Sequence, residues 1–411
     1  MELKAPKGTR DFLPQDMVKR QFVIDVARKI FERYGFEPME TPAFEDWGVL
    51  KAKGGEEVKN QIYYFKDKSE RELGLRFDLT VGTARVAAEN SDIPKPIKRY
   101  SIGKAWRYEE ISKGRYREFM QADIDIIGIK EMTADAECIA CIVDVLKELG
   151  LKDIKVRLNN RKTLSNFLKS IKLESKSEAI LRALDKFDKI GEIGVEAELL
   201  KTIDMKTSEK IMDFTKGKVK LSDDEGMNEL KELQKLLKML NVDAKIDIDY
   251  SLARGLGYYT GPVVEFMAGN YKKSVAGGGR YDNLIGVYGA DLPATGLSIG
   301  IDRIVDVLDE LRLFKVGKTN VQCFVAAVNK DVFEKAIEIS QNIRKAGINC
   351  AIDLQLKSLS KNLEYCNSKG VPKMIIVGPK DLENNKVTIR NMLTGKEDKI
   401  DIKKIVDVLK R

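Results

Sequence analysis

Residues 99–128, RYSIGKAWRYEEISKGRYREFMQADIDIIG, carry the clearest pattern in the chain and read as strand, charged loop and returning strand. In the returning strand, aromatic or polar side chains alternate with apolar ones. The aromatic or polar set is Phe119, Gln121, Asp123 and Asp125. Side chains two apart share one face of a strand. The pattern therefore predicts a hairpin with one face on a core and the other lining a polar site.

The first strand and the loop indicate what the polar face binds. Gly103 and Ala105 share a strand face and leave space for a flat ligand. Arg107, Arg115 and Arg117 add guanidinium groups, which bind phosphate in a bidentate manner. With the carboxylates of the returning strand available for a cation or an amine, we interpret the site as one for a nucleotide and an amino compound. The alternative is an ordinary amphipathic hairpin with a solvated face.

The chain of 411 residues contains no histidine. This absence excludes the usual neutral-pH general base, every Ser-His-Asp or Cys-His arrangement and every imidazole metal site. Any catalysis must then depend on positioning, arginine electrostatics and magnesium. Phosphoryl and nucleotidyl transfer is compatible with these means, because it needs charge stabilisation more than proton transfer.

Composition adds weaker constraints. The length predicts two or three domains, and the net charge of +8 permits an anionic partner such as RNA. The five cysteines are scattered, which favours reduced thiols. Cys138 and Cys141 form a CxxC pair, but it lies in a helical pattern without a second pair, so a zinc or redox site is disfavoured. Without an apolar run or signal region, we expect no membrane association and a cytoplasmic location.

Other segments suggest where the polar face finds its partners. A helix is expected over residues 14–34, and LGLRFDLT (73–80) reads as a strand that ends in Asp78 and Thr80. These short polar side chains suit a substrate amine or hydroxyl, although Thr80 could instead cap the following helix. In ATGLSIGIDRIVDVL (294–308), Arg303 lies in the first helical turn, where an anion or stacked base would offset its unfavourable position.

The composition and spacing of residues along the chain predict its domains. Residues 162–242 repeat Lys, Glu and Leu at helical spacing and read as a helical insertion, which divides a catalytic domain into residues 1–161 and 243–318. Residues 319–411 alternate strands and helices and read as a separate α/β module.

Several motifs together resemble the histidyl-tRNA synthetase family of class II aminoacyl-tRNA synthetases. GTRDFLP, the 99–128 hairpin and GLSIGIDRI resemble the three class II motifs. SLARGLGYYTG and GGGRYDNL resemble the two signatures specific to the histidine enzymes, and LRFDLT resembles the archaeal and eukaryotic branch. The resemblance implies an α+β fold with an antiparallel catalytic sheet, flanking helices, the helical insertion and a C-terminal anticodon-binding domain.

The resemblance also implies an activity and its partners. The chain would activate L-histidine with ATP and Mg²⁺ to histidyl-adenylate and transfer histidine to the 3' end of tRNA(His), as a homodimer. Arg107 would hold the α-phosphate and the substrate carboxylate, Glu109 would read the adenine amino group, and Arg115 would reach the γ-phosphate. Phe119 and Arg303 would enclose the adenine.

The remaining implied roles concern the amino acid. Histidine, chiefly its amino group, would be held by Asp78, Thr80, Gln121 and Asp125. Arg254 would act catalytically on the α-phosphate in the transition state, and Tyr258 and Tyr259 would line the imidazole pocket. No residue of the chain is assigned to a metal.

Two other readings remain as alternatives. One is a catalytically silent paralogue, such as the synthetase-like subunit of ATP phosphoribosyltransferase, which typically lacks the anticodon module and the arginine signature. The other is a nucleic-acid-binding module without chemistry, which leaves the arranged arginines and tyrosines unexplained.

Overall fold

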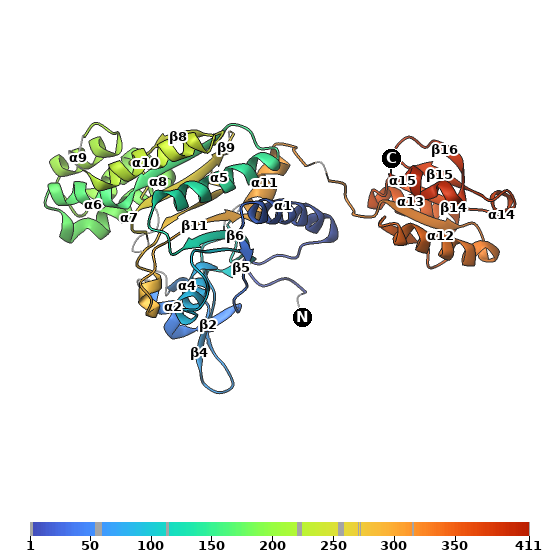
Figure 1. Ribbon diagram of the computed structural model, residues 1–411, viewed down its shortest axis with the longest axis horizontal. Coiled ribbons are helices and arrows are strands. Elements are labelled where there is room, and N and C mark those ends of the chain that lie inside the picture. Colours follow the sequence, from blue (N-terminus) through green and yellow to red (C-terminus); the bar gives the residue numbers. More distant parts are fainter. Residues whose placement is uncertain are drawn as a thin grey trace. The chain divides into compact units, whose positions relative to one another are not determined.

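The computed structural model divides into two units, each described here by itself (Figure 1). The larger unit comprises residues 1–11 and 23–313, and the smaller comprises residues 12–22 and 314–411. The described residues are 3–53, 60–111, 115–219, 224–253, 259–269, 271, 273–314 and 316–410. The predicted division at residues 161, 242 and 318 stays a prediction.

The larger unit is organised around an eight-stranded sheet in the order β1-β5-β6-β11-β10-β9-β7-β8. Its strands are β1 (Glu37–Pro38), β5 (Ile97–Trp106), β6 (Glu118–Ile127), β7 (Ile154–Asn160), β8 (Lys245–Ile248), β9 (Pro262–Ala268), β10 (Ala276–Arg280) and β11 (Ala294–Gly300). The six central strands are antiparallel, and the edge strands β1 and β8 run parallel to their neighbours. The predicted α+β class with an antiparallel sheet is confirmed.

The predicted hairpin is formed by β5 and β6, with Gly103 opposite Gln121 and Ala105 opposite Phe119. The expected open polar face is only partly present. From Phe119 to Gln121 the strand is half-buried, whereas Asp123 and every residue from there to the end of β6 are buried. The far half of the polar face is covered because other segments pack over it. Leu79, for example, accepts from Arg99 opposite Asp125, and the Tyr281 hydroxyl donates to Asp125 itself.

Helices flank the sheet. They include α1 (Pro14–Arg33), α5 (Met132–Glu148), α10 (Glu225–Met239) and α11 (Ile301–Glu310). The helix expected over residues 14–34 is confirmed. It ends before Gly35, which adopts a φ of 74° that side-chain-bearing residues rarely take. Helix α5 is apolar on most sides, and it packs between the sheet and α10.

Residues 162–242, predicted to be a helical insertion, contain helices, but their assignment as an insertion with these bounds stays a prediction. Besides α10, the segment contains α6 (Arg161–Ser170), α7 (Ser177–Asp185), α8 (Phe187–Leu199) and α9 (Met205–Thr215), with a short 3-10 turn over Glu174–Lys176. They share a core in which the rings of Phe167 and Phe214 stack at 4.1 Å. Arg157 of β7 forms ion pairs with Asp188 of α8, Asp249 and Glu265, so this segment is tied to the sheet.

A three-stranded sheet lies beside the hairpin. It is formed by β2 (Phe44–Asp46), β3 (Tyr64–Lys66) and β4 (Glu72–Leu75), with helices α2 (Trp47–Lys53) and α4 (Thr80–Glu89). The strand predicted over residues 73–80 ends at Leu75, because the following residues turn to begin α4. A 3-10 turn over Ile285–Tyr288 packs against α4.

The smaller unit contains a five-stranded sheet in the order β13-β12-β14-β15-β16, and its first three strands are parallel. The strands are β12 (Cys323–Ala327), β13 (Cys350–Ile352), β14 (Lys373–Val377), β15 (Lys386–Asn391) and β16 (Glu397–Asp401). The helices are α12 (Phe333–Lys345), α13 (Leu359–Lys369), α14 (Pro379–Leu382) and α15 (Ile405–Lys410), with 3-10 turns over Lys330–Val332 and Ile402–Lys404. Apolar clusters cover both faces, as expected of an α/β module.

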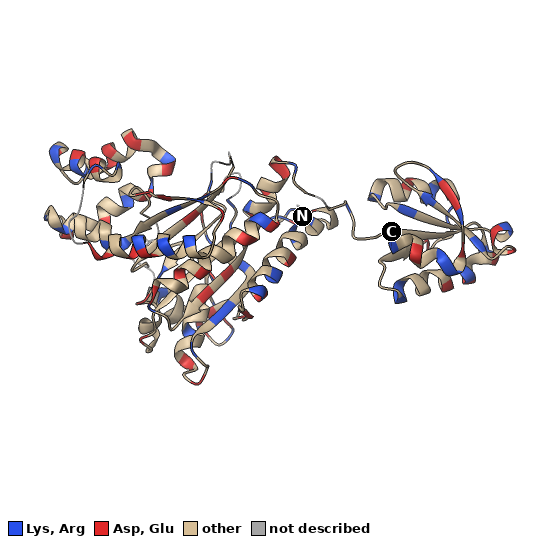
Figure 2. Cartoon of the chain, turned by 45° about the horizontal axis from the view of Figure 1, so that its top comes forward, with Lys and Arg blue, Asp and Glu red and all other residues tan. Residues whose placement is uncertain are grey.

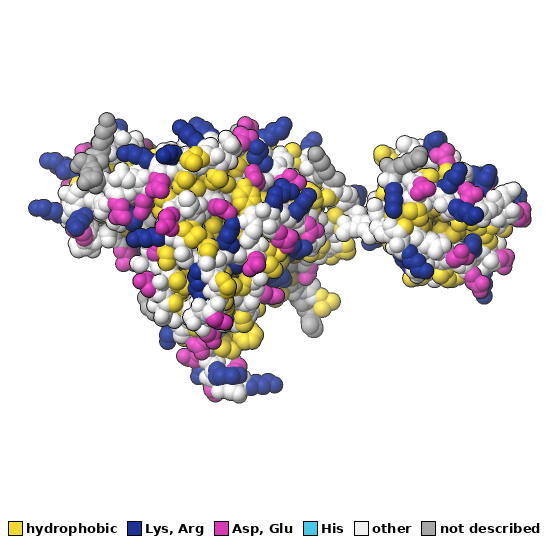
Figure 3. All heavy atoms as spheres, viewed as in Figure 1, with side chains coloured by type: hydrophobic (Ala, Val, Ile, Leu, Met, Phe, Trp, Pro, Cys, Tyr) yellow, Lys and Arg dark blue, Asp and Glu magenta, His cyan; other side chains and the backbone are white. Residues whose placement is uncertain are grey.

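Charge is distributed without a dominant sign. Lys and Arg are interspersed with Asp and Glu along the helices of both units (Figure 2), and the visible face of the space-filling view shows both signs (Figure 3). In the part of the chain that the structure describes, no helix combines the length and apolarity needed to cross a membrane.

A buried ion pair gives a test of the fold. Asp135 of α5 pairs with Arg280 of β10, and both side chains are 2% exposed. Truncation of one partner leaves the other charge buried, so Asp135→Ala should lower the free energy of unfolding by about 3–5 kcal/mol in urea titrations. Asp243→Ala, which removes an exposed partner of Lys147, is the matched control and should cost less than about 1 kcal/mol. Equal losses in the two variants would contradict the structural role given to Asp135.

Candidate functional site

The floor of the site is a stretch of backbone without side chains, where β6, β11 and β10 lie side by side. A Cβ atom on Gly296 would lie 2.0 Å from Asp125 Oδ1, and one on Gly278 would lie 2.2 Å from the carbonyl oxygen of Gly296. Both positions therefore require glycine, because a side chain would enter occupied space. Above this floor is a small pocket lined by Thr80, Asp123, Asp125, Tyr259, Tyr281, Ser298 and the neighbouring glycines.

Asp125 is held within the protein. Its carboxylate lies 2.5 Å from Arg99 Nη2 and accepts a hydrogen bond from the Tyr281 hydroxyl. Both side chains of the ion pair are 2% exposed or less. Asp125 lines the pocket, but Arg99 already balances its charge. Its contact with substrate therefore stays a prediction.

Asp123, on the same face of β6, is less completely partnered. It is 3% exposed, and no hydrogen-bond partner among the described residues reaches its Oδ1 atom. Burial raises the pKa of this carboxyl to about 7, although Arg99 and a hydrogen bond from Ser298 oppose the increase and Asp125 and Asp78 add to it. The strand pattern places Asp123 on the polar face, but we did not expect it among the residues that hold histidine.

Gln121 continues the same polar row. Its Nε2 atom donates to Ser298 Oγ at 2.5 Å, and its buried Oε1 atom likewise has no hydrogen-bond partner within the described ranges. Ser298 therefore connects Gln121 to Asp123. The two side chains together present acceptor atoms that the described residues leave unused, as a site for an N–H-bearing ligand would.

Asp78 rather than Thr80 caps helix α4. Asp78 Oδ1 accepts the backbone N–H groups of Thr80 and Val81 at 3.1 and 2.9 Å. This corrects the alternative in which Thr80 serves as the cap, and Thr80 instead lines the pocket. Thr80 therefore borders the pocket, Asp78 is near enough for its charge to raise the pKa of Asp123, and the substrate contacts of both stay predictions.

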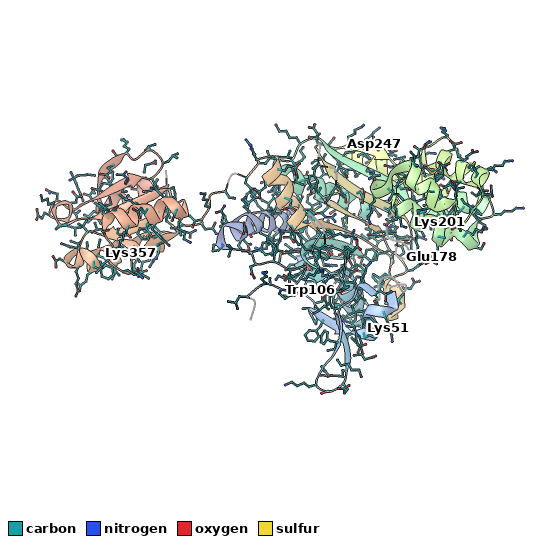
Figure 4. The ribbon with its side chains drawn as sticks, turned by 180° about the vertical axis from the view of Figure 1, so that it is seen from behind. Lys51, Trp106, Glu178, Lys201, Asp247 and Lys357 are labelled. Atoms are coloured by element: carbon teal, nitrogen blue, oxygen red, sulfur yellow. The ribbon has the colours of Figure 1, made fainter. Side chains whose placement is uncertain are left out.

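The expected nucleotide residues gather at the open end of the hairpin. The guanidinium carbon of Arg107 lies 5.2 Å from the ring centre of Phe119, and Arg107 Nε donates to the Phe77 carbonyl at 2.8 Å. The stick view labels Trp106, the residue before Arg107, at the end of β5 (Figure 4). Glu109 and Arg115, predicted to bind opposite ends of ATP, form an ion pair with each other.

The pair between Glu109 and Arg115 is partly shielded from solvent. Burial raises the pKa of Glu109, but the hydrogen bond and charge of Arg115 outweigh that effect and hold the pKa below its ordinary value. Glu109 is therefore an ionised acceptor at neutral pH, and the pair must open if both residues contact a nucleotide.

The third arginine approaches the same end of β6 from α11. Asp302 accepts the backbone N–H of Met120 at 3.0 Å, which fixes the start of α11 against β6, and Arg303 follows it with Nη1 donating to the Ser274 carbonyl at 3.1 Å. Arg10 pairs with Asp302 at 3.4 Å and lies 4.1 Å over the Tyr116 ring. Arg10 belongs to the motif GTRDFLP, and neither it nor Asp302 was expected in the site from the sequence.

Arg254 and Tyr258 lie outside the described residues. Tyr259 is described and lines the pocket, where burial, then the charges of Asp78, Asp123 and Asp125, raise its hydroxyl pKa. It therefore stays a neutral phenol that both donates and accepts hydrogen bonds.

The CxxC cysteines, Cys138 and Cys141, are buried in α5, where burial raises both pKa values. Within the described residues, no group of three or more metal-binding side chains occurs.

Comparisons with known proteins agree along the whole chain. The family model described as "Histidyl-tRNA synthetase" matches residues 8–304, and the one described as "Anticodon binding domain" matches residues 322–411. The proteins named histidine–tRNA ligase from Aeropyrum pernix and Pyrococcus furiosus are each 38% identical to this chain. The alignments cover 99% of this chain and 98% and 99% of those relatives, respectively.

Solved structures give the same result. A histidyl-tRNA synthetase from Nostoc superposes with a TM-score of 0.87 at 29% identity, covering 100% of this chain and 99% of that one. A Bacillus halodurans chain described as an ATP phosphoribosyltransferase regulatory subunit/histidyl-tRNA synthetase has a TM-score of 0.76 at 21% identity and covers 92% of this chain and 99% of that one. At that identity the likeness concerns the fold alone.

The buried carboxyl of Asp123 predicts a pH-dependent stability. Because its folded pKa of about 7 lies above the ordinary value of 3.8, the folded state retains a proton that the unfolded state loses. The contribution of this bound proton to the free energy of unfolding is fully present below about pH 4 and is lost as the pH rises to about 7. Asp123→Asn should therefore be more stable than the wild type, by a margin that grows by about 2–3 kcal/mol between pH 5 and 8 in urea titrations.

Asp249→Asn is the control for this titration. Burial raises the pKa of Asp249, but Ser251 and Arg157 outweigh it and hold the pKa below its ordinary value. Asp249 therefore stays ionised from pH 5 to 8, and its replacement should cost the same free energy throughout. A pH-independent difference between the wild type and Asp123→Asn would contradict the assignment of a neutral-range pKa to Asp123.

Proposed function

Because the chain belongs to the histidyl-tRNA synthetase family, we propose that β6 is the strand along which it binds ATP and L-histidine. The chain is a histidine–tRNA ligase: it activates histidine with ATP and transfers it to the 3' end of tRNA(His). The observation that carries the proposal is the order of side chains along β6. Phe119 and nearby arginines lie at the open end, and the unused acceptors Gln121 and Asp123 follow toward the pocket.

ATP occupies the open end in this proposal. The adenine lies between Phe119 and Arg303, and Arg107 contacts the α-phosphate. Entry of the nucleotide separates Glu109 from Arg115, so that the carboxylate accepts from the adenine amino group and the guanidinium binds the γ-phosphate. The ion pair seen between these two residues supports this step, because it holds both side chains at the site before ATP arrives.

Histidine occupies the pocket. Its ammonium group has three donors, and two of them go to Gln121 Oε1 and Asp123 Oδ1, which have no hydrogen-bond partner among the residues that the structure describes. Asp78 and Thr80 approach from the start of α4, and Asp125 acts at the pocket wall with its charge fixed by Arg99. The hydroxyls of Tyr258 and Tyr259 serve the imidazole, which needs both a donor and an acceptor.

The first reaction needs no protein base. A carboxylate oxygen of histidine attacks the α-phosphorus, a P–O bond forms, the bond to the β-phosphate oxygen breaks, and pyrophosphate leaves. Arg107 and Arg254 stabilise the negative charge that gathers on the α-phosphate in the transition state. Mg²⁺ would accompany the triphosphate and neutralise part of its charge, and the proposal assigns no residue of this chain to the metal. This chemistry agrees with a chain that has no histidine.

The smaller unit supplies the contact with tRNA in this proposal. Residues 322–411 of this unit match the anticodon-binding family model, and the net charge of +8 on the whole chain suits a polyanionic partner. We also propose a homodimer in the cytoplasm. Light scattering at micromolar concentration tests the dimer, and a monomeric mass would contradict it.

Histidine-dependent exchange of pyrophosphate into ATP tests the activity directly. The Bacillus halodurans chain described as a regulatory subunit/histidyl-tRNA synthetase has a similar fold. If this chain were a regulatory paralogue without catalysis, it would give no exchange. Exchange that depends on a different amino acid would contradict the substrate.

Arg254→Ala tests the proposed charge stabilisation. Removing a preorganised donor to the α-phosphate should reduce kcat for pyrophosphate exchange by about 10²–10³-fold, with little change in KM for ATP or histidine. Arg254→Lys should recover only part of the rate, because a lysine ammonium lacks the bidentate fork. Full activity of Arg254→Ala would remove Arg254 from the mechanism.

Asp123→Asn tests the proposed amine contact. The loss of a charged acceptor should raise KM for histidine by about 10- to 100-fold at pH 8, while KM for ATP stays within about twofold. Ser298→Ala, which removes the hydroxyl between Gln121 and Asp123, should have a smaller effect in the same direction. An unchanged KM for histidine in Asp123→Asn would contradict the contact.

A further inference from the structure

Two cysteines of the smaller unit face each other across neighbouring strands. Cys323 of β12 and Cys350 of β13 are register partners in a parallel pair. Adjacent strands lie about 4.8 Å apart, which is within the range of Cα separations that a disulfide spans, roughly 4.4–6.8 Å. Both side chains belong to the apolar cluster on one face of the sheet, and Cys350 Sγ donates to the Ala351 carbonyl at 3.4 Å.

The two thiols differ in their access to solvent. Cys323 is 0% exposed, whereas Cys350 is partly exposed and lines a cavity of about 380 Å³ together with Arg344, Ile348 and Asn349. A water molecule in the liquid takes about 30 Å³, so the cavity admits small oxidants. Arg344 Nε donates to the Cys350 carbonyl at 2.9 Å and brings its positive charge to the same wall.

Electrostatics favour Cys350 as the reactive member. The hydrogen bond from Cys323 lowers the pKa of the Cys350 thiol, burial opposes this, and Arg344 lowers it further. The pKa of Cys323 is raised by its hydrogen bond to Cys350 and by burial. An accessible thiol with a lowered pKa beside a buried thiol is the usual arrangement of an attacking and a resolving cysteine.

The other three cysteines lack these features. Cys138 and Cys141 are buried in α5, and Cys366 is buried in α13. Burial is the first cause of a raised pKa at all three, to about 11 for Cys366. They provide internal controls within the same chain.

We propose that Cys323 and Cys350 are a reversible oxidation site, which forms a disulfide when a hydroperoxide enters the cavity beside Cys350. The Cys350 thiolate attacks one peroxide oxygen, the O–O bond breaks, and Cys350 becomes a sulfenic acid while hydroxide leaves. Cys323 sulfur then attacks the Cys350 sulfur, an S–S bond forms, and the S–O bond breaks. The released hydroxide takes the Cys323 proton. With hydrogen peroxide, two thiols lose two electrons in total, and the peroxide is reduced to two waters.

The test is hydrogen peroxide treatment of the reduced full-length protein, followed by alkylation in denaturant, digestion and mass spectrometry. The expected product is a peptide pair joined through Cys323 and Cys350, lighter by two hydrogen atoms than the free thiols and released by dithiothreitol. Cys350 should lose its free thiol on the order of ten times faster than Cys366. The proposal is overturned if Cys323 and Cys350 lose their free thiols no faster than Cys366. It is also overturned if Cys350 is oxidised to sulfinic acid without forming the disulfide.

Single variants assign the two roles. Cys323→Ser should stop at a sulfenic acid on Cys350, detectable with dimedone, and Cys350→Ser should leave Cys323 reduced because oxidant does not reach it. Cys366→Ser is the matched control and should form the disulfide at the wild-type rate. Histidine-dependent pyrophosphate exchange should be unchanged in all three, which separates this proposal from the proposed catalytic function. Circular dichroism establishes that each variant is folded, and rapid oxidation of Cys323 in Cys350→Ser would contradict the order of attack.

Discussion

The ion pair between Arg99 and Asp125 is the interaction on which the arrangement of the pocket depends. It joins β5 to β6 at the wall of the pocket, and the Tyr281 hydroxyl adds a contact from the end of β10. Because both charges are almost fully buried, neither side chain can turn away without leaving the other uncompensated. The pair thereby fixes the position of β6 and leaves Asp123 as the carboxyl with an unused acceptor.

The sequence predicted the scaffold of the site well, because the two-residue period of strands and the 3.6-residue period of helices depend only on local chain geometry. The β5–β6 hairpin, helix α1 and the α/β module followed from such patterns, and the structure confirms them. The burial of the polar face was not predictable in the same way. It arises from segments around Leu79 and Tyr281, which are distant in sequence, and no periodicity in β6 reports what packs over it.

Smaller differences have similar causes. Asp78 and Thr80 are both competent helix caps, and only the turn after Leu75 decides between them. Strand β16 carries no sequence signal of a strand, because its residues, EDKID, are charged and mostly exposed at a sheet edge and lack an apolar alternation. Likewise, cysteines close in sequence proved less informative than cysteines close in space. The CxxC pair is enclosed in a helix, whereas Cys323 and Cys350 meet only when β13 aligns with β12.

The glycines beneath the pocket have a consequence for how this protein can change. Gly278 and Gly296 are packed against backbone and a fixed carboxylate. No larger residue can therefore replace either glycine at the base of the cavity without moving its neighbours. New substrate preferences would have to originate in the walls, from residues such as Ser298 and Thr80, which border the same space. The backbone of the fold thus sets the depth of the cavity, while substitutions in its walls can change which groups it binds.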